Sequence, residues 1–110
     1  MNFFFKFPQN DKNFFWTKHA QEKMRYYQLS ETKIKNLFYH YHRQEEGIVP
    51  GTMARMQTVG SRKRPTEIWM MGQPDPDQLG RIKIITVWRY PGVSKKREVP
   101  VPEDIRRLLI

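Results

Sequence analysis

A chain of 110 residues with 38% hydrophobic and 28% charged residues can bury one hydrophobic core, which excludes a disordered chain and two separately folded domains. The absence of cysteine excludes disulfides and thiolate metal sites, and no segment is long and apolar enough for a signal peptide or a membrane span. We therefore expect a cytoplasmic protein with one domain over residues 1–110 and a core over about 14–92. The formal charge of +9 points to a nucleic acid as the partner.

The first half of the chain predicts one strand and two helices. Phe3–Phe7 reads as a short strand that ends at Pro8. Thr17 is the expected N-cap of a helix over Lys18–Gln28, whose apolar stripe contains Trp16, Ala20, Met24 and Tyr27. Ser30 is the expected N-cap of a second helix, with an apolar stripe of Ile34, Leu37, Phe38 and Tyr41.

The second half has the alternation of strands. Three strands are expected over Thr52–Val59, Glu67–Gly72 and Arg81–Tyr90, separated by a hairpin loop at residues 60–65 and a turn at residues 74–80. On the last strand, Ile82, Ile84, Thr86 and Trp88 should share one face. Pro102 should start a short C-terminal helix. The expected fold is α+β, with two N-terminal helices on one face of a small, mostly antiparallel sheet.

Two stretches resemble a known family. Thr17–Met24, with the sequence TKHAQEKM, is similar to the HAxxRM first helix of small uncharacterised domains related to the RelE, ParE and BrnT toxins, and Ile84–Trp88 is similar to their closing strand. Lys23 and Gln28 stand where the family tends to have Arg and Gly. The resemblance implies a RelE/ParE-like fold. It also implies either a metal-independent endoribonuclease of the toxin type, with an antitoxin as partner, or a ParE-like inhibitor of another protein.

The resemblance and the charge together suggest a catalytic site. His19 could transfer a proton to or from a ribose hydroxyl or a leaving oxygen, although it could equally make a local hydrogen bond on an ordinary helix edge. Metal-free RNA cleavage also needs cations around the phosphate. The candidates for this site are His19, Lys23, Arg55, Arg89 and Tyr90.

Clusters of Lys and Arg predict where RNA or the ribosome would bind. The candidate phosphate contacts are Arg62, Lys63, Arg64, Lys83, Lys95, Lys96 and Arg97. His40 and His42 point apart on a helix, so we expect no metal, and the sequence contains no glycine-rich nucleotide loop that would indicate a cofactor.

The sequence leaves open whether the protein is an enzyme. One alternative is a basic nucleic-acid-binding module without catalysis. Another is a protein-inhibiting domain that docks through Val99–Ile110, with an apolar stripe of Ile105, Leu108 and Leu109.

Overall fold

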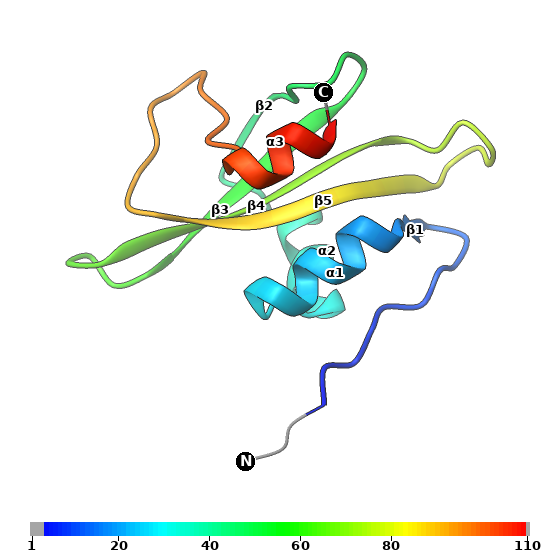
Figure 1. Cartoon of the computed structure of the whole chain (residues 1–110), viewed down its shortest axis with the longest axis horizontal. Coiled ribbons are helices and arrows are strands. Elements are labelled where there is room, and N and C mark those ends of the chain that lie inside the picture. Colours follow the sequence, from blue (N-terminus) through cyan, green and yellow to red (C-terminus); the bar gives the residue numbers. More distant parts are fainter. Residues whose placement is uncertain (1–3, 110) are drawn as a thin grey trace.

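The computed structural model describes residues 4–109 and has an α+β fold with a five-stranded mixed sheet and three helices (Figure 1). The elements follow the chain as β1 (Phe14–Trp16), α1 (Lys18–Tyr27), α2 (Glu31–Tyr39), β2 (Arg43–Glu46), β3 (Met53–Gly60), β4 (Pro65–Pro74), β5 (Ile82–Pro91) and α3 (Glu103–Leu109). No helix among the described residues is long and apolar enough to cross a membrane.

The sheet has the strand order β1-β5-β4-β3-β2. β2, β3, β4 and β5 pair antiparallel in sequence, whereas β1 lies parallel to β5, with Phe14 opposite Ile82 and Trp16 opposite Ile84. The predicted α+β class and mainly antiparallel sheet are confirmed.

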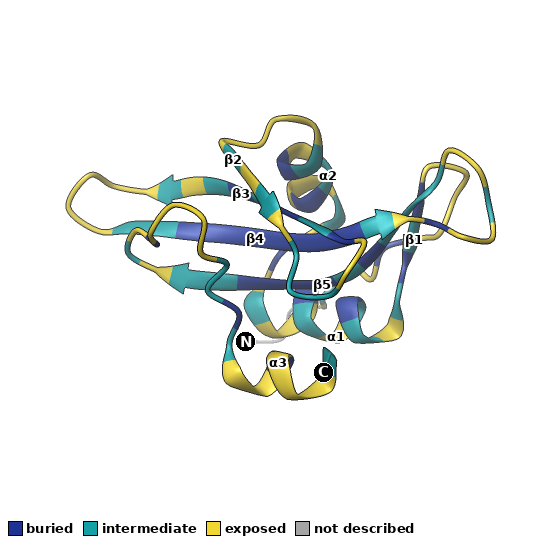
Figure 2. Cartoon of the chain, turned by 90° about the horizontal axis from the view of Figure 1, so that it is seen from above, coloured by how far each residue is buried: buried dark blue, intermediate teal, exposed yellow. Residues whose placement is uncertain are grey.

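β4 is buried along most of its length (Figure 2), and apolar side chains cover both of its faces. Ile68 and Met70 belong to the core that α1 and α2 complete with Met24 and Leu37. The alternate residues Trp69 and Met71 belong to a second core, which α3 and the preceding segment complete with Ile105 and Val101. In Figure 1, α1 and α2 accordingly lie below the sheet and α3 lies above it.

Both long N-terminal helices begin at the predicted caps. The hydroxyl of Thr17 accepts a hydrogen bond from the Ala20 amide at 3.0 Å, and the hydroxyl of Ser30 accepts one from the Lys33 amide at 3.1 Å. These bonds satisfy amide groups that have no partner within the helix. α2 stops at Tyr39, so Tyr41 lies outside the helix and is 43% exposed, contrary to its predicted place in the apolar stripe.

The predicted first strand is wrong. Phe4–Phe7 form no strand, and Phe3 lies outside the described residues. β1 instead forms at Phe14–Trp16, where the side chain of Asn10 accepts the Trp16 amide and that of Asp11 accepts the Phe14 amide. The sequence also gave no indication of β2, because its four residues are all polar or charged.

The predicted faces of β5 hold for only part of the strand. A bulge between Met71 and Gly72 shifts the pairing of β4 with β5, so Ile84 packs in the same core as Val87 rather than with Trp88. A side chain at Gly72 would place its Cβ 2.8 Å from the Lys83 carbonyl oxygen, so only glycine fits there.

α3 is more deeply packed than a docking helix should be. Ile105 is fully buried and Leu109 contacts the second core, whereas Leu108 is 69% exposed. The predicted docking stripe of Ile105, Leu108 and Leu109 is therefore mainly part of the core, and Ile110 lies outside the described residues.

Truncating a buried side chain of β4 should measure how much the burial of this strand contributes to the free energy of unfolding. Met70→Ala should lower the free energy of unfolding by about 2–5 kcal/mol, because Met70 is fully buried and the cavity cannot close completely. Leu79→Ala, at a fully exposed turn residue, should change it by less than about 0.5 kcal/mol. Urea unfolding of both variants tests this; equal effects would contradict the burial of β4.

Candidate functional site

Two loops at one end of the sheet carry exposed cations. The β3–β4 hairpin turns at Gly60, whose φ of +86° and close approach to the Arg64 carbonyl both require glycine. The hydroxyl of Ser61 accepts the Arg64 amide at 3.1 Å and closes the tip. Arg62, Lys63 and Arg64 are all exposed on it.

The second loop, residues 92–98, begins beside this hairpin. The Gly92 amide donates to the Pro65 carbonyl at 2.9 Å, which joins the end of β5 to the start of β4. Figures 1 and 2 show both loops at the same end of the sheet. Lys95, Lys96 and Arg97 are exposed here, and together with Arg62, Lys63 and Arg64 they form what we call the cationic end.

A buried carboxylate holds the second loop in place. Glu67 on β4 is fully buried, and its oxygens accept the Ser94 amide at 3.0 Å, the Ser94 hydroxyl at 2.6 Å and the indole N–H of Trp69 at 3.0 Å. A buried carboxylate is costly unless it is hydrogen-bonded, and these donors meet that need. The position of Ser94 is therefore fixed from inside the protein.

Arg43 on β2 fixes the same loop from its outer side. Its guanidinium donates to the Ser94 carbonyl at 3.1 Å, the Ser94 hydroxyl at 2.8 Å and the Glu98 carbonyl at 3.0 Å. The Arg97 amide donates to Glu45 at 2.8 Å. The backbone around Lys95, Lys96 and Arg97 is thus tied to two strands while the three side chains remain exposed.

His19 lies on the edge of α1, at a distance from these loops. Its Nε2 is 2.9 Å from the Thr86 hydroxyl oxygen, and it lines a pocket of about 460 Å³ with Lys83 and Leu108. Burial lowers the pKa of His19 below its ordinary value of 6.5, and the charge of Lys23 lowers it further, while Glu22 and Asp104 act in the opposite direction. Neutral imidazole is therefore favoured in this site.

The two candidate catalytic arginines hold parts of the fold together. Arg89 donates hydrogen bonds to the carbonyls of Tyr27 at 2.7 Å and Gln28 at 3.3 Å. These bonds give partners to carbonyl groups at the C-terminal end of α1 that have none within the helix. Arg55 donates to the Phe38 carbonyl at 2.7 Å, and its guanidinium lies 4.3 Å from the ring centre of Phe38 and 4.4 Å from that of Tyr41.

The remaining candidates also have structural partners. Lys23 pairs with Asp104 of α3 at 2.7 Å, and this bond lowers the pKa of the Asp104 carboxyl. Tyr90 packs against the second core. Lys83 lies beside His19 and is eight residues before the end of β5, about 26 Å along the strand from the cationic end.

Among the predicted catalytic residues, His19 and Lys23 lie one turn apart on α1, whereas the two arginines lie away from them. His19 is near the start of α1 and Arg89 binds its last carbonyls, which are about 12 Å away along the helix axis. The guanidinium of Arg55 is held by α2 rather than by α1. Of the predicted nucleic-acid contacts, all except Lys83 lie in the two loops of the cationic end.

Comparison with known proteins adds no assignment. No family model, no curated protein and no solved structure matches this chain. Among residues 4–109, no three His, Asp or Glu side chains are placed to hold a metal ion. The likeness to the RelE, ParE and BrnT toxins therefore stays a prediction, and the candidate site is defined by its geometry alone.

Sequence reasoning missed Glu67 and Ser94. Glu67 stands at the start of a predicted strand, and only its place between Thr66 and the apolar run that follows could have suggested an inward-facing carboxylate. Ser94 gave no signal. The pair matters because it positions the loop that carries Lys95, Lys96 and Arg97.

Removal of the buried charge should loosen the loop. In Glu67→Gln an NH2 group replaces one of the two oxygens and cannot accept the hydrogen bond that Ser94 donates to that oxygen, so we expect a loss of roughly 1–3 kcal/mol in unfolding free energy. Hydrogen exchange at the Ser94 amide should accelerate. The control Glu98→Gln, at an exposed position of the same loop, should change neither measurement.

The lowered pKa of His19 predicts a pH dependence of stability. The unfolded chain takes up a proton at His19 near pH 6.5, before the folded chain does, so unfolding free energy should fall as the pH drops below 6.5. His19→Gln should remove this part of the decline, and exposed His40→Gln serves as the control. Urea unfolding between pH 7.5 and 5 is the measurement; an unchanged pH profile in His19→Gln would contradict the assignment.

Proposed function

We propose that the protein is a nucleic-acid-binding module that binds RNA through the cationic end, without catalysing its cleavage. The observation that supports this most directly is the pair of neighbouring loops that present six exposed cations at one end of the sheet. Lys and Arg side chains on such loops contact phosphates, and their charge supplies most of the affinity in sequence-independent binding.

The arrangement of the loops favours binding over a merely solubilising role. A loop that is tied by Glu67 and Arg43 loses little conformational freedom when a ligand binds, so less of the interaction energy is spent on ordering it. Of the acidic residues nearby, Glu67 is buried and Glu45 is bonded to the loop backbone, whereas Glu98 is exposed at the end of the second loop and lowers its net charge by one.

The geometry gives less support to the endoribonuclease that the family resemblance implied. A metal-free nuclease needs a proton-transferring group and phosphate-binding cations around one phosphate. His19, Arg55 and Arg89 are each held at separate places by Thr86, Phe38 and Tyr27. A RelE/ParE-like fold and an antitoxin partner remain compatible with the order of elements and are not needed for the proposal.

Neutralising the hairpin tip should weaken RNA binding and its salt dependence. The triple variant Arg62→Ala, Lys63→Ala, Arg64→Ala should lose roughly 0.7 units of slope in a plot of log affinity against log salt for each phosphate contact removed. Fluorescence anisotropy with labelled RNA and DNA at several KCl concentrations measures this slope.

The matched control removes the same charge elsewhere. Lys12→Ala, Lys33→Ala, Arg106→Ala changes three exposed cations away from the two loops and should retain most of the slope. Equal losses in both triple variants would show that only net charge matters and would overturn the proposed site. Cleavage of RNA in EDTA by the wild type would instead favour the nuclease.

A further inference from the structure

Aromatic side chains that the cores do not use lie along the outer side of α1, one from the helix and two from the N-terminal segment packed beside it. Tyr26 is 73% exposed, Phe4 is 93% exposed and Phe7 is 41% exposed. Phe4 therefore lies outside both cores, whereas Trp69 and Trp88 are fully buried. We call Phe4, Phe7, Arg25 and Tyr26 the aromatic face of α1.

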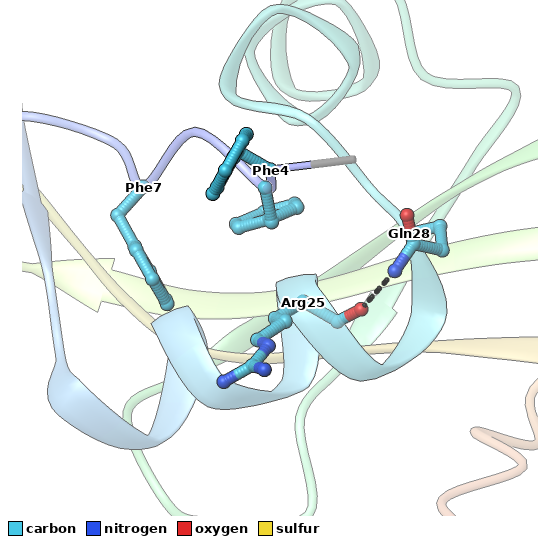
Figure 3. Close-up of a pocket in the computed structure, with 5 residues that line it drawn as sticks. Phe4, Phe7, Arg25 and Gln28 are labelled. Carbon is cyan, nitrogen blue, oxygen red and sulfur yellow. Dashed lines mark hydrogen bonds between the residues drawn. The ribbon is translucent and has the colours of Figure 1, made fainter. Parts of the chain in front are cut away.

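This face is hollowed on both sides of Phe7 and Arg25. One hollow of about 450 Å³ is lined by Phe4, Phe7, Arg25 and Gln28 (Figure 3), and the next, of about 340 Å³, is lined by Phe7, Arg25, Gln28 and Tyr26. Two adjoining hollows with flat rings on their walls provide space for successive flat ligand groups.

Polar groups in these hollows are suited to a negatively charged chain. The Arg25 guanidinium makes no hydrogen bond or ion pair with any of residues 4–109. The Gln28 amide nitrogen donates to the Arg25 carbonyl at 2.7 Å, which fixes the amide at the edge of the first hollow (Figure 3). Glu22 is the one acidic residue lining either hollow.

The C-terminal end of α1 lies near the end of the sheet that carries the cationic end, with α1 below the sheet and the loop of residues 92–98 above it (Figure 1). Arg89 of β5 binds the last carbonyls of α1, and β5 ends two residues later at Pro91, about 7 Å further along the strand. The loop with Lys95 begins there, and Gly92 connects it to the hairpin. Figure 1 shows the C-terminal part of α1 pointing toward this end of the sheet.

We propose that the aromatic face of α1 stacks the bases of single-stranded RNA whose phosphates lie on the cationic end. The inference rests on the proposed function and narrows its substrate class. Proteins that bind single strands combine a positively charged track with exposed aromatic rings, because every unpaired base offers a flat surface for stacking. In a duplex the bases are already stacked on each other, so this face would contribute nothing.

The test compares single and double strands with the full chain. Labelled oligouridylate and a labelled RNA duplex of the same length are titrated with the wild type, Tyr26→Ala and Tyr26→Phe by fluorescence anisotropy. Tyr26→Ala should bind oligouridylate roughly tenfold more weakly, an effect typical of losing one stacked base, and should bind the duplex as the wild type does. Tyr26→Phe should retain wild-type affinity because the ring remains.

A matched control and a second measurement separate the possible outcomes. Tyr39→Ala removes a tyrosine of similar exposure from α2 and should leave both affinities unchanged. Equal wild-type affinity for both probes, with no effect of Tyr26→Ala, would overturn this inference while the loop variants still test the proposed function. Self-association in sedimentation velocity that Phe7→Ala abolishes, without single-strand preference, would show that the face is a protein interface instead.

Discussion

The fold depends on the burial of β4 on both faces. A strand buried on both faces needs apolar side chains on both sides, and the run from Ile68 to Met71 provides them, with Ile68 and Met70 on one side and Trp69 and Met71 on the other. One side needs α1 and α2 to exclude water, and the other needs α3. α3 is therefore part of the core structure. Ile105 is buried against the sheet, and the charged side chains of the helix are exposed to solvent.

Charge and position have to be considered separately in this protein. A net charge of +9 suggests that many basic residues could bind a ligand. Arg43, Arg55 and Arg89, however, donate hydrogen bonds to backbone carbonyls of the protein itself. Arginine suits this use because its planar group donates in several directions and still packs on aromatic rings. Six of the exposed cations are grouped on two neighbouring loops, where the backbone is fixed by Glu67, Ser94 and the Gly60 turn.

The helix starts, the β3–β4 hairpin and the cationic loops could be predicted from sequence because local features determine them. Thr17 and Ser30 cap their helices through bonds within three residues, and the hairpin depends on Gly60. β1 and β2 could not be predicted, since Phe14–Trp16 becomes a strand only by pairing with β5, and the polar β2 only by pairing with β3. The same limit applies to the candidate catalytic site. The sequence suggested that His19 and Arg89 act together, but Arg89 of β5 lies at the opposite end of α1 from His19, and this follows only from the assembled fold.

The parallel pairing of β1 with β5 has a consequence for synthesis on the ribosome. The Thr17 hydroxyl, next to β1, donates to the carbonyl of Ile85, 68 residues later, so β1 cannot join the sheet until β5 has emerged. At typical elongation rates this delay is on the order of several seconds. Phe14 and Trp16 must spend that time without their final neighbours, which makes the nascent chain a candidate substrate for chaperones that bind aromatic segments.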